Sequence, residues 1–185
     1  MRLRGLQRTP DYGHPGGVRG YVLVGGWPAS GKTTLARALA LELGVAYLSK
    51  DQVKEALMDV MGTPSTVAES QRLGRAAVFA VLRAAQGCPA AVIDSTWFPY
   101  ATGLVDALGG PFVEIRCDID VDVARRRYRS RRRDRRHLDT ERAESELWGD
   151  LVSPLGVGPL VRVDTSEAVD VAAVARLVRA ALPAP

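Results

Sequence analysis

The feature that most constrains this chain is a glycine-rich loop, Gly26-Trp27-Pro28-Ala29-Ser30-Gly31-Lys32-Thr33, which matches the pattern G-x-x-x-x-G-K-[ST] at every position. An apolar run at 21–25 precedes the loop and a helical pattern at 35–43 follows it, which is the context that the motif requires. The glycines let backbone N–H groups turn inward around a triphosphate, and the helix adds the positive end of its dipole. Lys32 would then reach the β- and γ-phosphates, and the Thr33 hydroxyl would bind Mg²⁺. The loop predicts binding of ATP with Mg²⁺, against the alternative of a strand-to-helix turn that binds nothing.

Short apolar runs alternate with helical patterns along the rest of the chain. Five runs favour strands, at 21–25, 45–48, 90–94, 112–116 and 160–163. Strands of this kind are typical of a parallel sheet, because the connecting helices bury both of its faces. We therefore expect an α/β, three-layer fold with a five-stranded parallel sheet and helices on both faces.

Two helix starts are predicted from capping residues. Ser49-Lys50-Asp51-Gln52 has the S-x-x-Q form of a capping box. The helix that follows would place an apolar face on Val53, Ala56, Leu57 and Val60. A further helical pattern covers 70–85, and the residues 164–167 would cap the last helix.

Length and composition place these elements in one domain. The chain has 185 residues, of which 46% are apolar and 25% charged, as in ordinary globular proteins. No apolar run approaches the ~20 residues that span a bilayer, so no membrane partner is expected. Residues 1–20 are rich in Gly, Arg and Pro and are predicted to form a flexible arm before a single domain at 21–185. Cys88 and Cys117 are too few for a disulfide framework, so a reduced, cytoplasmic setting is expected.

Positive charge is concentrated in one segment of the chain. Residues 125–136 contain nine arginines and one acid, Asp134, so the segment carries +8 while the rest of the chain carries −4. A local basic patch attracts anions, and a guanidinium is well suited to clamp a phosphate. The alternatives are a solvated face and a nucleic-acid surface.

Polar residues follow the ends of several predicted strands, where ligands of open parallel sheets bind. Asp51 follows the second strand and could act as a general base, or it could only favour the helix dipole. Asp94 ends the third strand, shortly before Trp97, and could hold Mg²⁺ or cap a turn. Lys54 is equally compatible with a substrate contact and with a solvated helix face.

Together these segments resemble the small P-loop kinases that group with polynucleotide 5′-kinase, chloramphenicol phosphotransferase, zeta-toxin kinases, and gluconate and shikimate kinases. The resemblance covers about 21–182. It rests on the glycine-rich loop and on the segments 49–51, 92–96 and 127–133. The chain has no long inserted lid domain and no second aspartate two residues before Asp51, so the resemblance does not supply the substrate.

The resemblance implies roles for residues outside the loop. An aspartate placed like Asp51 deprotonates the acceptor hydroxyl, and a basic residue placed like Lys54 touches the acceptor. Arginines placed like Arg127 and Arg131, in a short helical lid at about 125–150, stabilise the transferring phosphoryl group. The segment that contains Asp164 and Thr165 borders the adenine.

We accordingly expect an ATP- and Mg²⁺-dependent kinase that phosphorylates a hydroxyl of a sugar, nucleoside or antibiotic-like metabolite. The predicted catalytic residues are Lys32, Asp51, Arg127 and Arg131. Nucleotide contacts are expected from Gly26, Ala29, Ser30, Gly31, Lys32, Thr33, Thr34, Arg127, Asp164 and Thr165. Metal contacts are expected from Thr33 and Asp94, and acceptor contacts from Asp51, Lys54, Asp94 and Trp97. The alternatives are a polynucleotide 5′-hydroxyl kinase and a nucleotide-dependent RNA-binding module. Tyr128 is the only aromatic residue within the arginine run, which disfavours stacking of single strands there.

Overall fold

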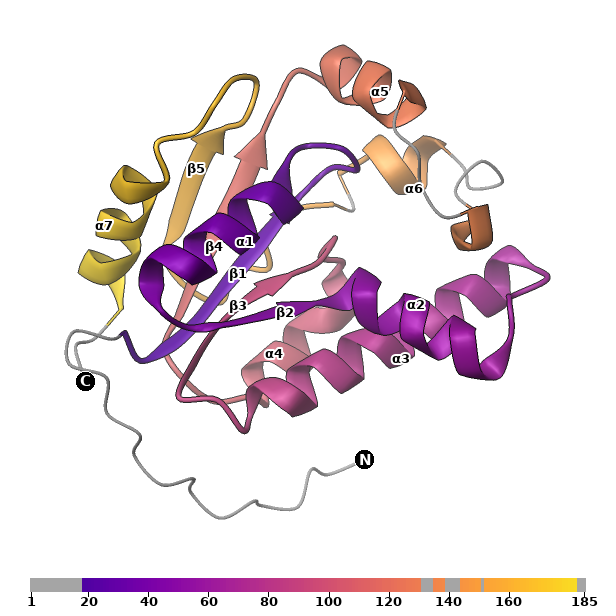
Figure 1. The fold of residues 1–185 in the computed structure, drawn as a ribbon, viewed down its shortest axis with the longest axis horizontal. Coiled ribbons are helices and arrows are strands. Elements are labelled where there is room, and N and C mark those ends of the chain that lie inside the picture. Colours follow the sequence, from indigo (N-terminus) through magenta and orange to yellow (C-terminus); the bar gives the residue numbers. More distant parts are fainter. Residues whose placement is uncertain (1–17, 131–134, 139–143, 151, 183–185) are drawn as a thin grey trace.

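The computed structural model describes residues 18–130, 135–138, 144–150 and 152–182. Its centre is a parallel sheet of five strands in the order β2-β3-β1-β4-β5 (Figure 1). The strands are β1 (Gly20–Gly26), β2 (Ala46–Ser49), β3 (Ala90–Asp94), β4 (Phe112–Asp118) and β5 (Leu160–Asp164). All four neighbouring pairs are parallel. The predicted five-stranded parallel sheet is confirmed.

Helices connect the strands and cover both faces of the sheet (Figure 1). They are α1 (Lys32–Leu43), α2 (Lys50–Met61), α3 (Val67–Ala85), α4 (Thr102–Asp106), α5 (Val121–Ser130), α6 (Glu144–Trp148) and α7 (Val171–Ala181). Two short 3₁₀ turns, η1 (Pro99–Ala101) and η2 (Arg135–His137), lie among them. Helices α1 and α7 share one apolar cluster with the sheet, and α3 and α4 share the other. The predicted three layers are confirmed.

The central strand β1 shows why the two clusters are separate. Successive side chains of a strand point to opposite faces. Accordingly Val22 and Val24 pack with α1 and α7, whereas Tyr21 and Leu23 pack with α3 and α4. This burial on both faces explains the continuous apolar run in the sequence.

Helix α2 buries a different face from the one predicted. Ser49 caps it as expected and accepts a hydrogen bond from the Gln52 N–H. However, the buried side chains are Lys54 and Met58, whereas Val60 is 88% exposed. The reason is that α2 packs mainly against α3 rather than on the sheet. A polar contact between the two helices, described below, takes the place of an apolar one.

The last helix begins later than the capping pattern predicted. Helix α7 starts at Val171, and Asp170 caps it by accepting a hydrogen bond from the Ala173 N–H. Asp164 instead accepts a hydrogen bond from the Ser166 N–H and closes a turn after β5. The expectation that 164–167 cap α7 is therefore wrong, because this aspartate satisfies a turn donor nearer in sequence.

The arginine-rich segment is not described as one continuous helix. Helix α5 ends at Ser130, and the short elements η2 and α6 follow. The predicted lid arginine Arg131 lies outside the described residues, as do residues 1–17 of the predicted arm. The flexible arm, the single domain at 21–185 and the lid at about 125–150 remain predictions.

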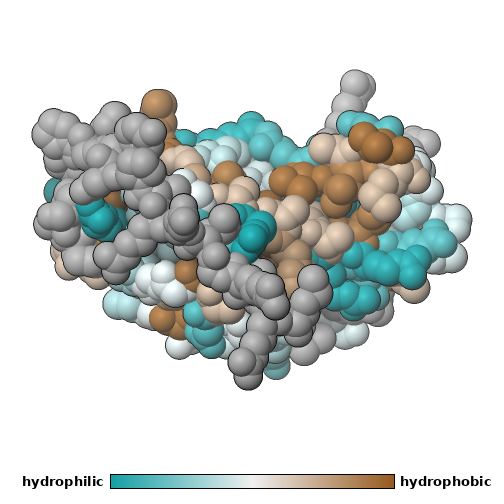
Figure 2. Space-filling view, turned by 90° about the horizontal axis from the view of Figure 1, so that it is seen from below, coloured by the Kyte–Doolittle hydropathy of each residue, from teal (hydrophilic) through white to brown (hydrophobic). Residues whose placement is uncertain are grey.

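The surface mixes hydrophilic and hydrophobic residues, as Figure 2 shows for one face. Exposed large apolar side chains include Val60 and Met61 of α2 and Phe79 of α3. Within the part of the chain that the structure describes, no helix is long and apolar enough to cross a membrane.

Candidate active site

The glycine-rich loop joins the end of β1 to the start of α1 and turns sharply. Gly26 and Gly31 have φ angles of 149° and 84°, values that L side chains rarely adopt, and Ala29 is left-handed at 58°. A Cβ atom at Gly26 would lie 2.6 Å from Ser30 Oγ and 2.9 Å from the Cys117 carbonyl oxygen. These contacts leave no room for a side chain. Because β1 ends at Gly26 and α1 begins at Lys32, the strand-loop-helix context predicted for the motif is present.

Lys32 lies at the first position of α1 and is largely buried. Its ammonium donates a hydrogen bond to the Trp27 carbonyl, 3.1 Å away across the loop. The Trp27 ring in turn lies 5.4 Å from the guanidinium carbon of Arg116. Below the loop, burial raises the pKa of the Cys117 thiol to about 12, so this thiol stays neutral and packs as a small apolar group. The loop is thus held by contacts of Lys32 and Arg116 with Trp27 and lies beside the buried Cys117.

Thr33 and Asp94 meet at the carboxyl edge of the sheet. Asp94 ends β3 beside Val24 of β1, and its Oδ2 accepts hydrogen bonds from the Thr33 hydroxyl at 2.7 Å and the Tyr47 hydroxyl at 3.1 Å. Its other carboxylate oxygen is buried and has no hydrogen-bond partner. Such a carboxylate and hydroxyl are the oxygen ligands that Mg²⁺ prefers. The side chains present therefore fit a magnesium ion.

Burial shapes the electrostatics of this pair. Removal from water raises the pKa of the Asp94 carboxyl above its ordinary value, and the nearby Lys32 ammonium and the Thr33 hydrogen bond act in the opposite direction. The charge of Asp51 raises the pKa of Asp94 further. The two carboxyl groups are therefore close enough to interact.

Asp51 lies in the first turn of α2, two residues beyond the β2 position that pairs with Asp94. Its side chain is 44% exposed, and its Oδ1 lies 2.9 Å from the Lys50 ammonium. The predicted acid is thus at the same edge of the sheet as the Thr33–Asp94 pair. Its carboxylate remains partly open to solvent.

Lys54 is buried, with 5% of its surface exposed. Its ammonium donates a 2.6 Å hydrogen bond to Ser70 Oγ of α3, and Ser70 donates in turn to the His137 carbonyl of η2. The alternative of a solvated helix-face lysine is therefore wrong. The Nε2 atom of His137 lies 3.0 Å from a carboxylate oxygen of Glu55.

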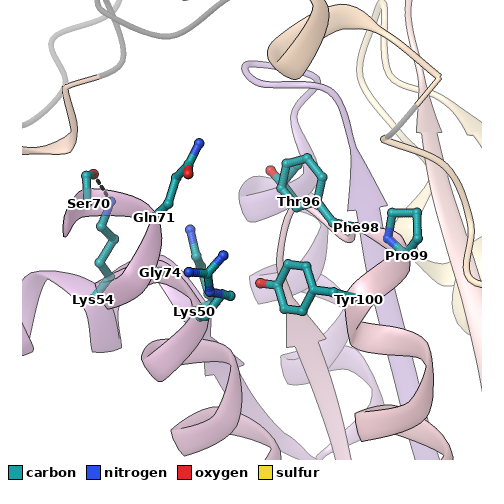
Figure 3. A pocket seen from close by; sticks show the side chains of 10 residues that line it. Lys50, Lys54, Ser70, Gln71, Gly74, Thr96, Phe98, Pro99 and Tyr100 are labelled. Atoms are coloured by element: carbon teal, nitrogen blue, oxygen red, sulfur yellow. Dashed lines mark hydrogen bonds between the residues drawn. The ribbon is translucent and has the colours of Figure 1, made fainter. Parts of the chain in front are cut away.

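A cavity of about 400 Å³ opens beside Lys50 and Lys54 (Figure 3). Its wall is formed by Lys50, Lys54, Ser70, Gln71, Gly74, Arg75, Thr96, Phe98, Pro99 and Tyr100. Of these, sequence reasoning placed only Lys54 in an acceptor site. One local signal was present, because Gly74 interrupts a helical pattern at a position where glycine is less favourable than alanine.

Trp97 does not line this cavity, which corrects its assignment as an acceptor contact. The side chain is 3% exposed and belongs to the apolar cluster under α3 and α4. Its indole N–H donates to the Val24 carbonyl at 3.2 Å, and the ring covers Gly25. The neighbouring residues Thr96 and Phe98 face the cavity instead.

Arg127 of α5 forms hydrogen bonds with the segment after β5. Its two terminal nitrogens donate to the carbonyl oxygens of Thr165 and Ser166. Thr165 is buried, donates through its hydroxyl to the Asp118 carbonyl, and lies within 4 Å of where a Cβ of Gly31 would be. The helix α5 therefore reaches the phosphate loop through this segment. Contacts of Arg127 and of Asp164 with a nucleotide stay predictions.

The curled loop, its buried lysine and the Thr33–Asp94 pair define a P-loop nucleotide-binding protein. The chain belongs to the AAA domain family, which matches residues 22–152. The resemblance to small P-loop kinases and the predicted fold are thereby confirmed, since solved P-loop kinases are similar in structure.

Several solved structures resemble this chain over most of its length. A protein from Chloroflexus aurantiacus, provisionally named a kinase, is 30% identical with a TM-score of 0.71 and covers 90% of this chain and 100% of its own. Kti12 of Chaetomium thermophilum, solved with ADP-AlF3, is 21% identical with a TM-score of 0.58, covering 89% of this chain and 100% of its own. A gluconokinase from Sinorhizobium meliloti is 20% identical with a TM-score of 0.54, covering 89% and 95%. The last two show the fold alone.

Curated relatives match a smaller part of the chain. An uncharacterized protein of Mycobacterium tuberculosis is 36% identical over an alignment of 117 residues, and the match covers 55% of this chain and 23% of that protein. A Mycobacterium bovis protein matches equally. The chain thus spans about a quarter of the length of these relatives.

Proposed function

We propose that this protein is an ATP- and Mg²⁺-dependent kinase that transfers the γ-phosphoryl group to a hydroxyl of a small molecule. The observation that supports the proposal most is that the predicted metal ligands and the predicted base lie at the same edge of the sheet. The Thr33–Asp94 pair and the half-exposed Asp51 carboxylate lie there together, next to a cavity of about 400 Å³. A phosphate cradle, a metal site, a base and an acceptor pocket are the parts that phosphoryl transfer requires.

The loop would bind the nucleotide. The ammonium of Lys32 would neutralise phosphate charge, and the backbone N–H groups of the loop would donate hydrogen bonds to the phosphates. Ser30 in the loop and Thr34 in the first turn of α1 would add further contacts. Thr33 and Asp94 would hold Mg²⁺, which when bound neutralises charge on the β- and γ-phosphates. Asp164 and Thr165 would border the base, on the side where Arg127 anchors α5.

Asp51 would act as the general base. The proton of the acceptor hydroxyl passes to the Asp51 carboxylate as the acceptor oxygen forms a bond to the γ-phosphorus. The bond between that phosphorus and the oxygen bridging to the β-phosphate breaks, and ADP leaves with the electron pair. Arg127 and Arg131 would stabilise the charge on the transferring group.

The size and the place of the cavity support a small-molecule acceptor. Pockets for small ligands hold about 300–1,000 Å³, and this cavity has about 400 Å³. The Chloroflexus aurantiacus relative, provisionally named a kinase, supports the same reaction class. A polynucleotide 5′-hydroxyl kinase is a distinct outcome of the test below.

The test measures transfer of labelled phosphate from γ-labelled ATP to sugars, nucleosides, aminoglycosides and a 5′-hydroxyl oligonucleotide. We expect a labelled small molecule, and a fall in kcat of about 10²–10⁴-fold in Asp51→Asn with little change in ATP affinity. The matched control is Asp106→Asn, an exposed acid of α4 that does not line the cavity, which should keep the parent rate. An Asp51→Asn variant that transfers phosphate at the parent rate would overturn the assignment. A labelled oligonucleotide alone would identify the alternative kinase.

A further inference from the structure

The walls of the cavity differ in chemical character (Figure 3). On one side lie Lys50 of α2 and Gln71 of α3, and on the other lie Phe98 and Tyr100. Arg75 of α3 also lines the cavity. Three of the ten lining residues are cations, of which Lys50 is paired with Asp51, and none of the ten is an aspartate or glutamate. The lining therefore attracts an anion on one side and offers aromatic surface on the other.

Resting on the proposed kinase function, we propose that the acceptor is an anionic small molecule. Its carboxylate or phosphate lies against Lys54 and Arg75, and its body lies against Phe98 and Tyr100. The hydroxyl that is phosphorylated lies at the other end, toward Asp51.

Lys54 places a buried positive charge at the wall of the cavity. An ammonium withdrawn from water is costly unless charge or hydrogen bonds compensate it. The hydrogen bond to Ser70 fixes the side chain at the cavity wall, because Ser70 is itself held by the His137 carbonyl. An anionic group in the cavity would add a charge-assisted hydrogen bond to a lysine already held in place.

The aromatic side of the cavity is arranged by the turn η1. Pro99 starts this turn, and the rings of Phe98 and Tyr100 on either side of it are nearly parallel, with centroids 6.3 Å apart and an angle of 13°. Tyr100 is 44% exposed. Flat or ring-shaped ligands pack well on such surfaces.

Gly74 provides the space between these walls. Its backbone is helical, where glycine is unfavourable relative to alanine. A Cβ atom there would meet only the end of the Lys50 side chain, at 3.8–3.9 Å. Alanine would therefore fit, whereas a leucine would extend into the cavity.

The test compares anionic ligands with their neutral counterparts. Glucuronate is paired with glucose, and uridine 3′-monophosphate with uridine, and each is titrated by calorimetry into protein saturated with Mg²⁺ and a non-hydrolysable ATP analogue. We expect at least one anionic member to bind about 10-fold tighter than its neutral partner, since hydrogen bonds to charged groups are the stronger ones.

Variants of the lining residues test whether the cationic side chains of the cavity cause the preference for anionic ligands. Lys54→Met and Arg75→Gln should remove it, and Arg72→Gln, an exposed neighbour on α3 that does not line the cavity, should keep it. Arg75 is exposed, so Arg75→Gln remains informative if Lys54→Met does not fold. Gly74→Leu should abolish binding of both members while Gly74→Ala retains it.

The outcomes separate this inference from the proposed function. Equal binding within both pairs, no binding of the anionic members, or a preference that survives Lys54→Met and Arg75→Gln would overturn it. Binding of a 5′-hydroxyl oligonucleotide alone would also overturn it. A preference for anions without phosphate transfer to any compound would support the inference and count against the kinase.

Discussion

Substitution of Trp97 distinguishes a residue of the apolar core, whose loss lowers stability, from a residue that contacts the acceptor, whose loss weakens binding. In Trp97→Phe the indole N–H that donates to the Val24 carbonyl is lost, at a cost of about 0.5–1.5 kcal/mol. The carbonyl itself keeps the hydrogen bond from the Ser95 N–H, so no buried acceptor is orphaned. Partial emptying of the site adds about 0.5–1.5 kcal/mol, by comparison with other small core truncations.

The free energy of unfolding should therefore fall by about 1–3 kcal/mol. At about 2–4 °C per kcal/mol for a domain of this size, Tm should drop by about 2–12 °C. Thermal and urea unfolding measure the loss, and KM values for ATP and the acceptor should stay near those of the parent. The neighbouring Phe98→Leu is the matched control, because Phe98 lines the cavity and should weaken acceptor binding with a smaller loss of stability. An unchanged Tm in Trp97→Phe, with a raised KM for the acceptor, would refute the core assignment.

Two further predictions concern charged groups. Burial raises the pKa of Asp94, so the folded state favours its neutral form, and the stability of the metal-free protein should decrease as pH rises through that pKa. In Asp94→Asn, the free energy of unfolding measured with urea should no longer depend on pH in this range, and Mg²⁺ with ATP should no longer stabilise the protein. A pH profile of Asp94→Asn like that of the parent would contradict this role of Asp94. Arg127→Ala should lower kcat at least about 10-fold, or 1.4 kcal/mol of barrier height, in steady-state assays. The exposed Arg126→Ala should stay within a few-fold of the parent, and equal effects of both would remove Arg127 from the site.

The sequence predicts the sheet and the phosphate loop well because both depend on local patterns. The motif at 26–33 specifies its own strand and helix, and strands buried on both faces appear as apolar runs. The positions of Thr33 and Asp94 follow from the same topology, since adjacent parallel strands end at one edge of the sheet.

The cavity beside Lys50 and Lys54 could not be predicted in the same way. It forms where α2 and α3 meet the segment after β3, so its lining depends on tertiary packing. Residues 96–100 have no regular period, and the sequence does not distinguish the buried Trp97 from the cavity-facing Phe98. The burial of Lys54 could not be predicted from the sequence either, because its hydrogen-bond partner Ser70 is sixteen residues away on another helix.

The most direct test of the account is turnover and binding of ATP by the parent and by Lys32→Ala. Lys32 is the only side-chain cation in the loop, and it lies at the first position of α1. We expect Lys32→Ala to bind Mg²⁺ with ATP more weakly in calorimetry and to form no ADP, while its circular dichroism spectrum matches that of the parent. Unchanged ADP formation and unchanged ATP affinity in Lys32→Ala would contradict the central claim that this loop binds the triphosphate for phosphoryl transfer.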